Sequence, residues 1–257
     1  MRVLVTNDDG VWAPGIAVLA RALRDHGLDV VVAAPLDDRS GSSAAIGPGY
    51  AAEGIAVERA ELPDLEGVPA HGVEGPPGMA VIAARLGAFG APPDIVMSGI
   101  NPGNNTGRSV LHSGTVGAAL TAANFGARGV AVSVGVAEGE VDPDFDTAAV
   151  FAVRAYDWLF SAPVGTVLNV NVPNVPMAEV RGVKAARLAP FGTVRTALAG
   201  SEGGRLQLEL RATGVELEPD TDTALVQAGY VAVTPLVGVR ASDGGEQAAD
   251  FLERALT

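Results

Sequence analysis

The amino-acid sequence predicts an α/β protein with a Rossmann-like, mostly parallel sheet that carries helices on both faces. Three observations support this fold class. Short apolar runs alternate with helix-length amphipathic stretches, a rhythm typical of parallel strands buried on both faces. The chain has 257 residues and 48% hydrophobic content, which is enough for a large core. Beyond Asn174 the rhythm changes, and β-like segments follow one another, which indicates a β-rich extension.

The elements of the predicted core alternate along the chain. A strand over 2–6 (RVLVT) precedes a helix over 15–27, where apolar residues recur at helical spacing and Gly27 ends the pattern. We expect four more strands, at 29–35, 93–99, 129–135 and 165–173. We expect two more helices, at 114–126 and 145–160. Residues 1–173 therefore form the predicted Rossmann-like core.

Residues 174–257 are predicted to extend this core as part of the same unit. We expect β-segments at 182–189, 205–218 and 230–236, and a hairpin tip within 199–206. An amphipathic helix is expected over 245–257. These β-segments lack a helix-covered core of their own, and unpaired strand edges favour pairing with another chain.

Composition excludes several classes of function. The formal net charge of −13 argues against binding to a nucleic acid duplex, although a cation in a site still allows a small phosphorylated substrate. With no cysteine, disulfides, thiolate metal sites and cysteine nucleophiles are all excluded. The N-terminal apolar run is too short for a signal peptide, and no apolar stretch approaches the length of a membrane span. We expect a cytoplasmic protein.

Polar side chains follow several of the predicted strands. In an open parallel sheet, ligands bind beyond the carboxyl ends of the strands. The candidates there are Asn7, Asp8 and Asp9, then Asp37 to Ser40 with the run GSS, then Asn101, Asn104 and Asn105. Carboxylate, amide and hydroxyl oxygens are the ligands of a hard divalent cation such as Mg²⁺ or Mn²⁺. The segment NDDG alone is also typical of a plain turn.

The stretch HSGTVG opens the helix expected at 114–126. Ser113 and Thr115 lie in its first turn, where free N–H groups and the helix dipole favour an anion. Ser113 equally suits an ordinary N-cap, and this alternative stays open. His112 directly precedes this segment and is a candidate for substrate contact, whereas His26 and His71 are assigned structural roles. The dinucleotide fingerprint and the Walker pattern are both absent.

Several motifs together resemble the SurE family of survival-protein nucleotidases. The matching segments, in order, are VTNDDG followed by APGI, AAP followed by RSG, SGINPGNNTG, SGTVGAA, LNVNVP and GYVAVTPL. The resemblance covers most of the chain, and the motifs are jointly specific. It implies a metal-dependent phosphatase with a Rossmann-like core that acts on nucleoside 5′-monophosphates, with 3′-monophosphates as additional expected substrates.

The resemblance also implies roles for particular residues. A divalent metal, Mn²⁺ or Mg²⁺, would be held by Asp8, Asp9, Ser40 and Asn101. Phosphate contacts would come from Asn105, Ser113, Gly114 and Thr115. Either Asp8 or Asp9 would take the proton from the attacking water, and the residues alone do not choose between them. A C-terminal β-arm would pair subunits into a homodimer or homotetramer.

Two segments depart from the family pattern. Residues 75–80 read GPPGMA, so Pro76, Met79 and Ala80 stand where the family usually has Thr, Asp and Cys. Ala44 stands where the second loop usually carries His or Asn. Neither change touches the implied metal ligands, but both affect the expected substrate range. The alternative function is therefore a catalytically weak nucleotide-binding module with the same fold.

Overall fold

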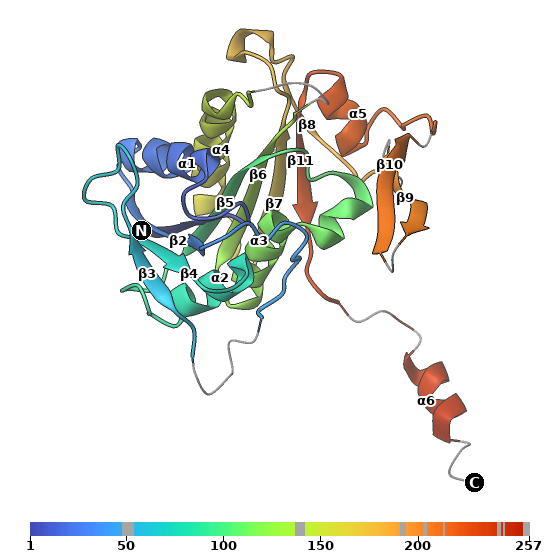
Figure 1. Ribbon diagram of the computed structural model, residues 1–257, viewed down its shortest axis with the longest axis horizontal. Helices are drawn as coiled ribbons and strands as arrows, with labels where there is room; N and C mark the ends of the chain where they lie inside the picture. Colours follow the sequence, from blue (N-terminus) through green and yellow to red (C-terminus); the bar gives the residue numbers. More distant parts are fainter. Residues whose placement is uncertain are drawn as a thin grey trace.

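The computed structural model describes residues 1–47, 54–136, 142–190, 194–202, 205–212, 214–240, 243 and 245–253 (Figure 1). Its centre is a nine-stranded sheet in the order β3-β4-β2-β1-β5-β6-β7-β11-β8. The strands are β1 (Arg2–Thr6), β2 (Asp29–Pro35), β3 (Val57–Ala60), β4 (Ala70–Val73), β5 (Ile95–Pro102), β6 (Arg128–Val134), β7 (Val167–Val172), β8 (Val183–Ala185) and β11 (Val231–Leu236). Among the described strands of this sheet, only β3 with β4 and β7 with β11 pair antiparallel, which confirms the mostly parallel sheet.

Helices cover both faces of this sheet, as predicted. On one face, α1 (Pro14–Asp25) and α4 (Phe145–Phe160) share one apolar cluster with Val3 and Val5 of β1. On the other face, α2 (Pro77–Arg85) and α3 (Gly114–Asn124) share a second apolar cluster with Leu4 of the same strand. Successive side chains of a strand point to opposite faces, so one short apolar run serves both layers.

The C-terminal part of the chain adds strands to the main sheet and also forms a second, smaller sheet. Strands β8 and β11 extend the sheet beyond β7, whereas β9 (Val194–Glu202) and β10 (Arg205–Ala212) form a separate antiparallel hairpin. The remaining elements are η1 (Gly107–His112), η2 (Met177–Glu179), α5 (Asp222–Gln227) and α6 (Gly245–Glu253). Helix α6 lies apart from the body of the molecule (Figure 1).

Some expected elements differ from those observed. Residues 214–218 form no strand, so the segment expected at 205–218 ends as a strand at Ala212. Helix α2, strands β3 and β9, and helix α5 were not anticipated as elements, whereas β4 is the short strand expected around His71. The tip of the expected hairpin at 203–204 and the end of the last expected helix at 254–257 lie outside the described residues.

A buried carboxylate connects the C-terminal part to the loop after β5. The side chain of Asp222, at the start of α5, is completely buried. Its Oδ2 accepts a 2.8 Å hydrogen bond from the N–H of Gly107, and its Oδ1 accepts one of 3.0 Å from the N–H of Ala189. Backbone hydrogen bonds to a carboxylate are strong. Asp222 therefore holds the segments around Gly107 and Ala189 next to each other.

Candidate functional site

The chain turns sharply where β1 ends. Asn7 is completely buried, and its Nδ2 donates a 3.0 Å hydrogen bond to the carbonyl of Gly10, which has a φ of +108°. An L side chain rarely adopts that φ, so glycine suits this position. The turn interpretation of NDDG is therefore correct as local structure. The turn also places Asp8 and Asp9 just beyond the edge of the sheet.

Asp8 is almost completely buried, with 4% of its surface exposed. Its Oδ1 accepts a 2.5 Å hydrogen bond from Oγ1 of Thr115, in the first turn of α3. Burial raises the pKa of the Asp8 carboxyl, while the hydrogen bonds from Thr115 and the backbone of Gly114 act in the opposite direction. The hydrogen bond from Thr115 thus fixes the orientation of the carboxylate, while the buried surroundings disfavour its negative charge.

Asp9 lies beside Asp8, but one of its two carboxylate oxygens receives no hydrogen bond from the described residues. Its Oδ2 is buried and has no hydrogen-bond partner within the described residues. Burial raises the pKa of Asp9 to about 7, and the charges of Asp8 and Asp38 add to the increase. Two neighbouring carboxylates with a buried, unpartnered oxygen are the arrangement that a bound cation would stabilise.

The N-terminus of α3 lies directly against Asp8. Ser113 is the N-cap of this helix, since its Oγ accepts a 3.1 Å hydrogen bond from the N–H of Val116. At Gly114 a Cβ atom would lie 2.7 Å from Oδ2 of Asp8 and 2.7 Å from Oγ of Ser42. Only glycine allows the helix to approach the carboxylate so closely. The helix N-terminus and the carboxylate pair therefore form one continuous site.

The loop after β2 presents its serines in different ways. Ser40, the metal ligand implied by the family resemblance, is exposed, and its N–H donates a 2.7 Å hydrogen bond to Asp38. Ser43 donates a 2.6 Å hydrogen bond through Oγ to the carbonyl of Leu111, which fastens the loop to η1. Ser42 differs from both, because its Oγ is buried, has no hydrogen-bond partner among the described residues and faces the position of Gly114. The sequence had left open the choice between Ser40 and Ser42.

The asparagines follow β5 at the same edge of the sheet. Asn101 pairs with Ser133 of β6 in the strand register, and its Nδ2 donates a 2.8 Å hydrogen bond to the carbonyl of Gly103. Asn105 is partly buried and donates a 2.8 Å hydrogen bond from Nδ2 to Oγ of Ser133. His112 is exposed at the end of η1, and its carbonyl accepts a hydrogen bond from the N–H of Ser43.

These residues fit a hard divalent cation. Among the described residues, no group of three or more His, Asp or Glu side chains is arranged as a metal site. A hard cation does not need one, because two carboxylates supplemented by neutral oxygens are a suitable donor set. Asp8, Asp9, Ser40 and Asn101 offer those oxygens, and Asp9 Oδ2 is buried with no hydrogen-bond partner in the described part of the chain. The chemistry of the donor set thus agrees with Mg²⁺ or Mn²⁺.

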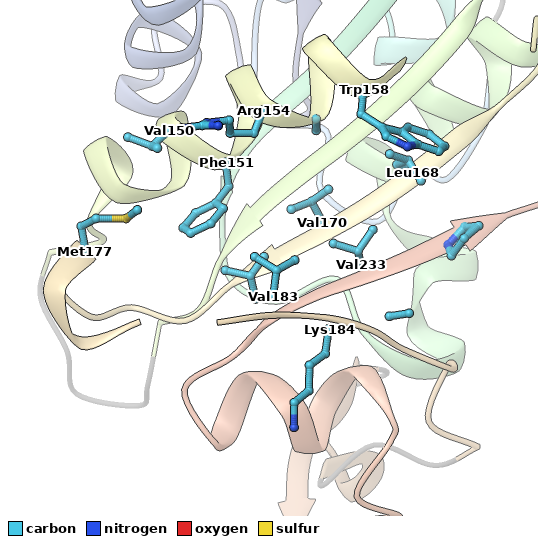
Figure 2. Close-up of a pocket in the computed structure, with 14 residues that line it drawn as sticks. Val150, Phe151, Arg154, Trp158, Leu168, Val170, Met177, Val183, Lys184 and Val233 are labelled. Carbon is cyan, nitrogen blue, oxygen red and sulfur yellow. The ribbon is translucent and has the colours of Figure 1, made fainter. Parts of the chain in front are cut away.

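A large groove lies elsewhere on the molecule. It has a volume of about 630 Å³ and lies between α4 and the strands β7, β8 and β11. Figure 2 shows Phe151 of α4 on one side of it and Val183 of β8 on the other. Its lining is mainly apolar and contains no carboxylate and none of the candidate site residues. The chemistry described above therefore belongs to the strand ends and not to this groove.

Comparison with known proteins identifies the family of this chain. The family model "Survival protein SurE" matches residues 3–193. A "5'-nucleotidase SurE" from Xylella fastidiosa is 38% identical, covering 92% of this chain and 89% of that protein. A "5'/3'-nucleotidase SurE" from Edwardsiella ictaluri is 36% identical, with coverage of 99% and 97%. The crystal structure of the SurE protein from Aquifex aeolicus has a TM-score of 0.80 and 28% identity, covering 98% of this chain and all of that one. On this evidence, the chain belongs to the SurE family.

Proposed function

We propose that the protein is a metal-dependent phosphomonoesterase that hydrolyses nucleoside 5′-monophosphates, and also 3′-monophosphates, to nucleoside and phosphate. The observation that carries the proposal is the contact between the buried Asp8 carboxylate and the N-terminus of α3. A carboxylate pair suits a cation, and a helix N-terminus suits an anion. The two lie side by side here, as a phosphoryl group bound to a metal requires. Relatives named 5'-nucleotidase and 5'/3'-nucleotidase support this substrate class.

The metal ligands in this proposal are Asp8, Asp9, Ser40 and Asn101. When bound, Mg²⁺ or Mn²⁺ would polarise a phosphoryl oxygen and lower the pKa of a water molecule. Thr115 holds Asp8 in a fixed orientation through its hydrogen bond. One carboxylate of the pair accepts the proton of the attacking water.

Phosphate binding is assigned to Asn105, Ser113, Gly114 and Thr115. In the first turn of α3, the N–H of Gly114 already bonds Asp8 and the N–H of Val116 bonds Oγ of Ser113. The N–H of Thr115 is therefore the proposed donor to phosphoryl oxygens as negative charge redistributes. Asn105 approaches from the loop after β5. His112 is placed next to them as a possible substrate contact, because η1 ends where α3 begins.

Phosphate release from a panel of nucleotides tests this function. We expect release from nucleoside monophosphates with Mn²⁺ or Mg²⁺, loss of activity in EDTA, and recovery when metal returns. The departures at Pro76 and Met79 favour a second candidate, a catalytically weak nucleotide-binding module. Nucleotide binding without metal-dependent phosphate release would support that module. Full activity in a sample shown to be metal-free by elemental analysis would contradict both the metal and the mechanism.

The cellular setting and assembly are proposed with this function. We place the protein in the cytoplasm. None of the helices described is both long and apolar enough to cross a membrane. We propose a homodimer or homotetramer formed through the part of the chain at 174–257, which extends the catalytic core at 1–173. The β9–β10 hairpin supports this assembly, because Leu198 and Leu206 expose 59% and 69% of their surface on it.

A further inference from the structure

Asn105 is held by hydrogen bonds to its peptide groups as well as to its side chain. Its N–H donates a 2.8 Å hydrogen bond to Oδ1 of Asn171. Its carbonyl accepts two more, of 2.8 Å from Nδ2 of Asn169 and 3.0 Å from Nδ2 of Asn171. With the bond from its own side chain to Ser133, four hydrogen bonds fix this one loop residue. Loop residues normally satisfy such groups with water.

The residues that hold Asn105 are deeply buried. Ser133, Asn169 and Asn171 are each completely inaccessible to solvent. Asn169 and Asn171 alternate along β7 with Leu168 and Val170, which face the apolar groove on the other side of the sheet. Burying asparagine in a sheet is costly unless its amide is hydrogen bonded. In β7 most of those hydrogen bonds are made to Asn105 and not to a neighbouring strand.

This arrangement retains an energetic cost that apolar residues would avoid. Oδ1 of Asn169 is buried and has no hydrogen-bond partner among the described residues. A leucine at this position would have a similar size and no unsatisfied oxygen, so stability alone favours an apolar residue there. The benefit of Asn169 must therefore lie in what its Nδ2 does, and its Nδ2 donates to the carbonyl of Asn105.

The same residues are in register with a proposed metal ligand. Asn101 of β5 pairs with Ser133 of β6, and Ser133 pairs with Asn171 of β7. One row across three neighbouring strands therefore carries the metal ligand and two of the side chains that hold Asn105. The row fixes the loop relative to the metal position through rigid sheet and not through a flexible connection.

We propose that Asn169 and Asn171, together with Ser133, are positioning residues that hold Asn105 in place for contact with the phosphoryl group. The inference rests on the proposed phosphatase function, in which Asn105 binds phosphate. The positioning residues do not touch the substrate. Their effect is to remove the freedom of the loop, so that Asn105 does not have to be ordered when the substrate binds.

The test compares Asn169→Leu, Asn171→Leu and Ser133→Ala with the wild type. Two readouts are measured: the dissociation constant of inorganic phosphate by calorimetry on the Mn²⁺-loaded protein, and KM and kcat for a nucleoside monophosphate. We expect each variant to weaken phosphate binding and to raise KM by about tenfold, with a smaller change in kcat. Ser133→Ala removes only one hydroxyl and should fold. It therefore still tests the inference if a leucine variant does not fold.

Two controls separate positioning from general stability. Thr234→Val removes a buried hydroxyl from β11, directly opposite Asn169 in the register, and this hydroxyl makes no hydrogen bond with Asn105 or any other described residue. Val170→Ala weakens the core on the groove side of β7. Both controls are expected to keep the phosphate dissociation constant and KM of the wild type. If the asparagine variants lower only the melting temperature, as Val170→Ala does, the inference is wrong.

A double-mutant cycle with Asn105→Ala shows whether the effect passes through Asn105. If Asn171 acts only by positioning it, adding Asn171→Leu to Asn105→Ala will not weaken phosphate binding further. Additive effects would overturn the inference. The proposed function is tested separately, because absence of nucleotide hydrolysis by the wild type would contradict the function itself, whatever the variants do.

Discussion

The Oγ1 atom of Thr115 donates a 2.5 Å hydrogen bond to Oδ1 of Asp8. The contact joins the first turn of α3 to the turn after β1, although 107 residues separate the two in sequence. Thr115 is completely buried. Its hydroxyl therefore orients the proposed metal ligand, in addition to the role in phosphate binding that we propose for this residue.

Replacing Thr115 by valine should lower activity through Asp8. Valine keeps the volume but leaves Oδ1 of Asp8 buried without its donor, at a cost of about 1–3 kcal/mol. We expect a lower melting temperature and weaker Mn²⁺ binding, measured by thermal melting and calorimetry. Thr115→Ser keeps the hydroxyl and should restore Mn²⁺ affinity. Equal Mn²⁺ affinity in valine and serine variants would show that this hydrogen bond does not orient the ligand.

Asp8→Asn should reduce turnover by at least about a hundredfold, since it removes an anionic ligand and alters the site of proton transfer. Asparagine retains an oxygen that accepts from Thr115, so the protein should stay folded. In EDTA the variant should melt at a higher temperature than the wild type, because two buried carboxylates no longer repel each other. Saturating Mn²⁺ should reverse this order. If the variant kept wild-type turnover and the same Mn²⁺-induced rise in melting temperature, NDDG would be a structural turn and not a metal site.

The metal-free protein should lose stability as the pH rises through the range where Asp9 ionises. The folded-state pKa of Asp9 is raised to about 7 from 3.8, so between these values the folded state binds more protons than the unfolded state. The free energy of unfolding therefore falls with rising pH. In EDTA, the melting temperature of the wild type should drop between about pH 5 and pH 8 more than that of Asp9→Asn. Parallel curves for the two proteins would contradict the raised pKa.

The three serines after β2 should give three different results. Ser42→Ala removes a buried hydroxyl that has no partner among the described residues and faces Gly114 of the proposed phosphate site, so stability should be kept while phosphate affinity falls severalfold. Ser43→Ala breaks the hydrogen bond to Leu111 and should cost about 1 kcal/mol of stability. Ser40→Ala should weaken Mn²⁺ binding and leave stability unchanged. Calorimetric titrations with Mn²⁺ and phosphate, beside thermal melts, distinguish the three. If Ser42→Ala alone weakened Mn²⁺ binding, the metal ligand would be Ser42.

Light scattering at micromolar concentration should give at least twice the mass of one chain. Leu206 exposes 69% of its surface on β10, and an aspartate there should disfavour burial between two copies. We expect Leu206→Asp to lower the measured mass. Leu86→Asp is the matched control, since Leu86 is 76% exposed at the end of α2, far from the hairpin in sequence. A monomeric wild type would refute the proposed assembly.

The main sheet was predictable because its strands are short apolar runs between amphipathic helices. Helix α2 was not predicted, because its short stretch was considered only as a departure from the family motif. Pro77 occupies the first helical position, where its missing N–H and fixed φ are tolerated. The antiparallel position of β11 between β7 and β8 was beyond sequence reasoning, since strand order depends on tertiary packing and not on local pattern.

At the site, we correctly predicted from the sequence that the ends of β1, β2 and β5 lie at one edge of the sheet. It did not distinguish Ser40 from Ser42, because the direction of a loop side chain is set by distant contacts such as that of Ser43 with η1. The asparagines of β7 were noted only as part of a motif. Two asparagines within the otherwise apolar VLNVNV were a signal, since an amide in a buried strand requires a partner outside the ladder.

The buried carboxylate of Asp222 determines when during synthesis the site can be completed. Its partner Gly107 follows Asn105 closely but lies 115 residues earlier in the chain than Asp222. All the proposed metal and phosphate residues have left the ribosome long before α5 does. Until then the N–H of Gly107 lacks this acceptor, and the loop has one fewer anchor. The nascent chain therefore carries its catalytic residues for most of its synthesis before their geometry is final, a long-range dependence that slows folding.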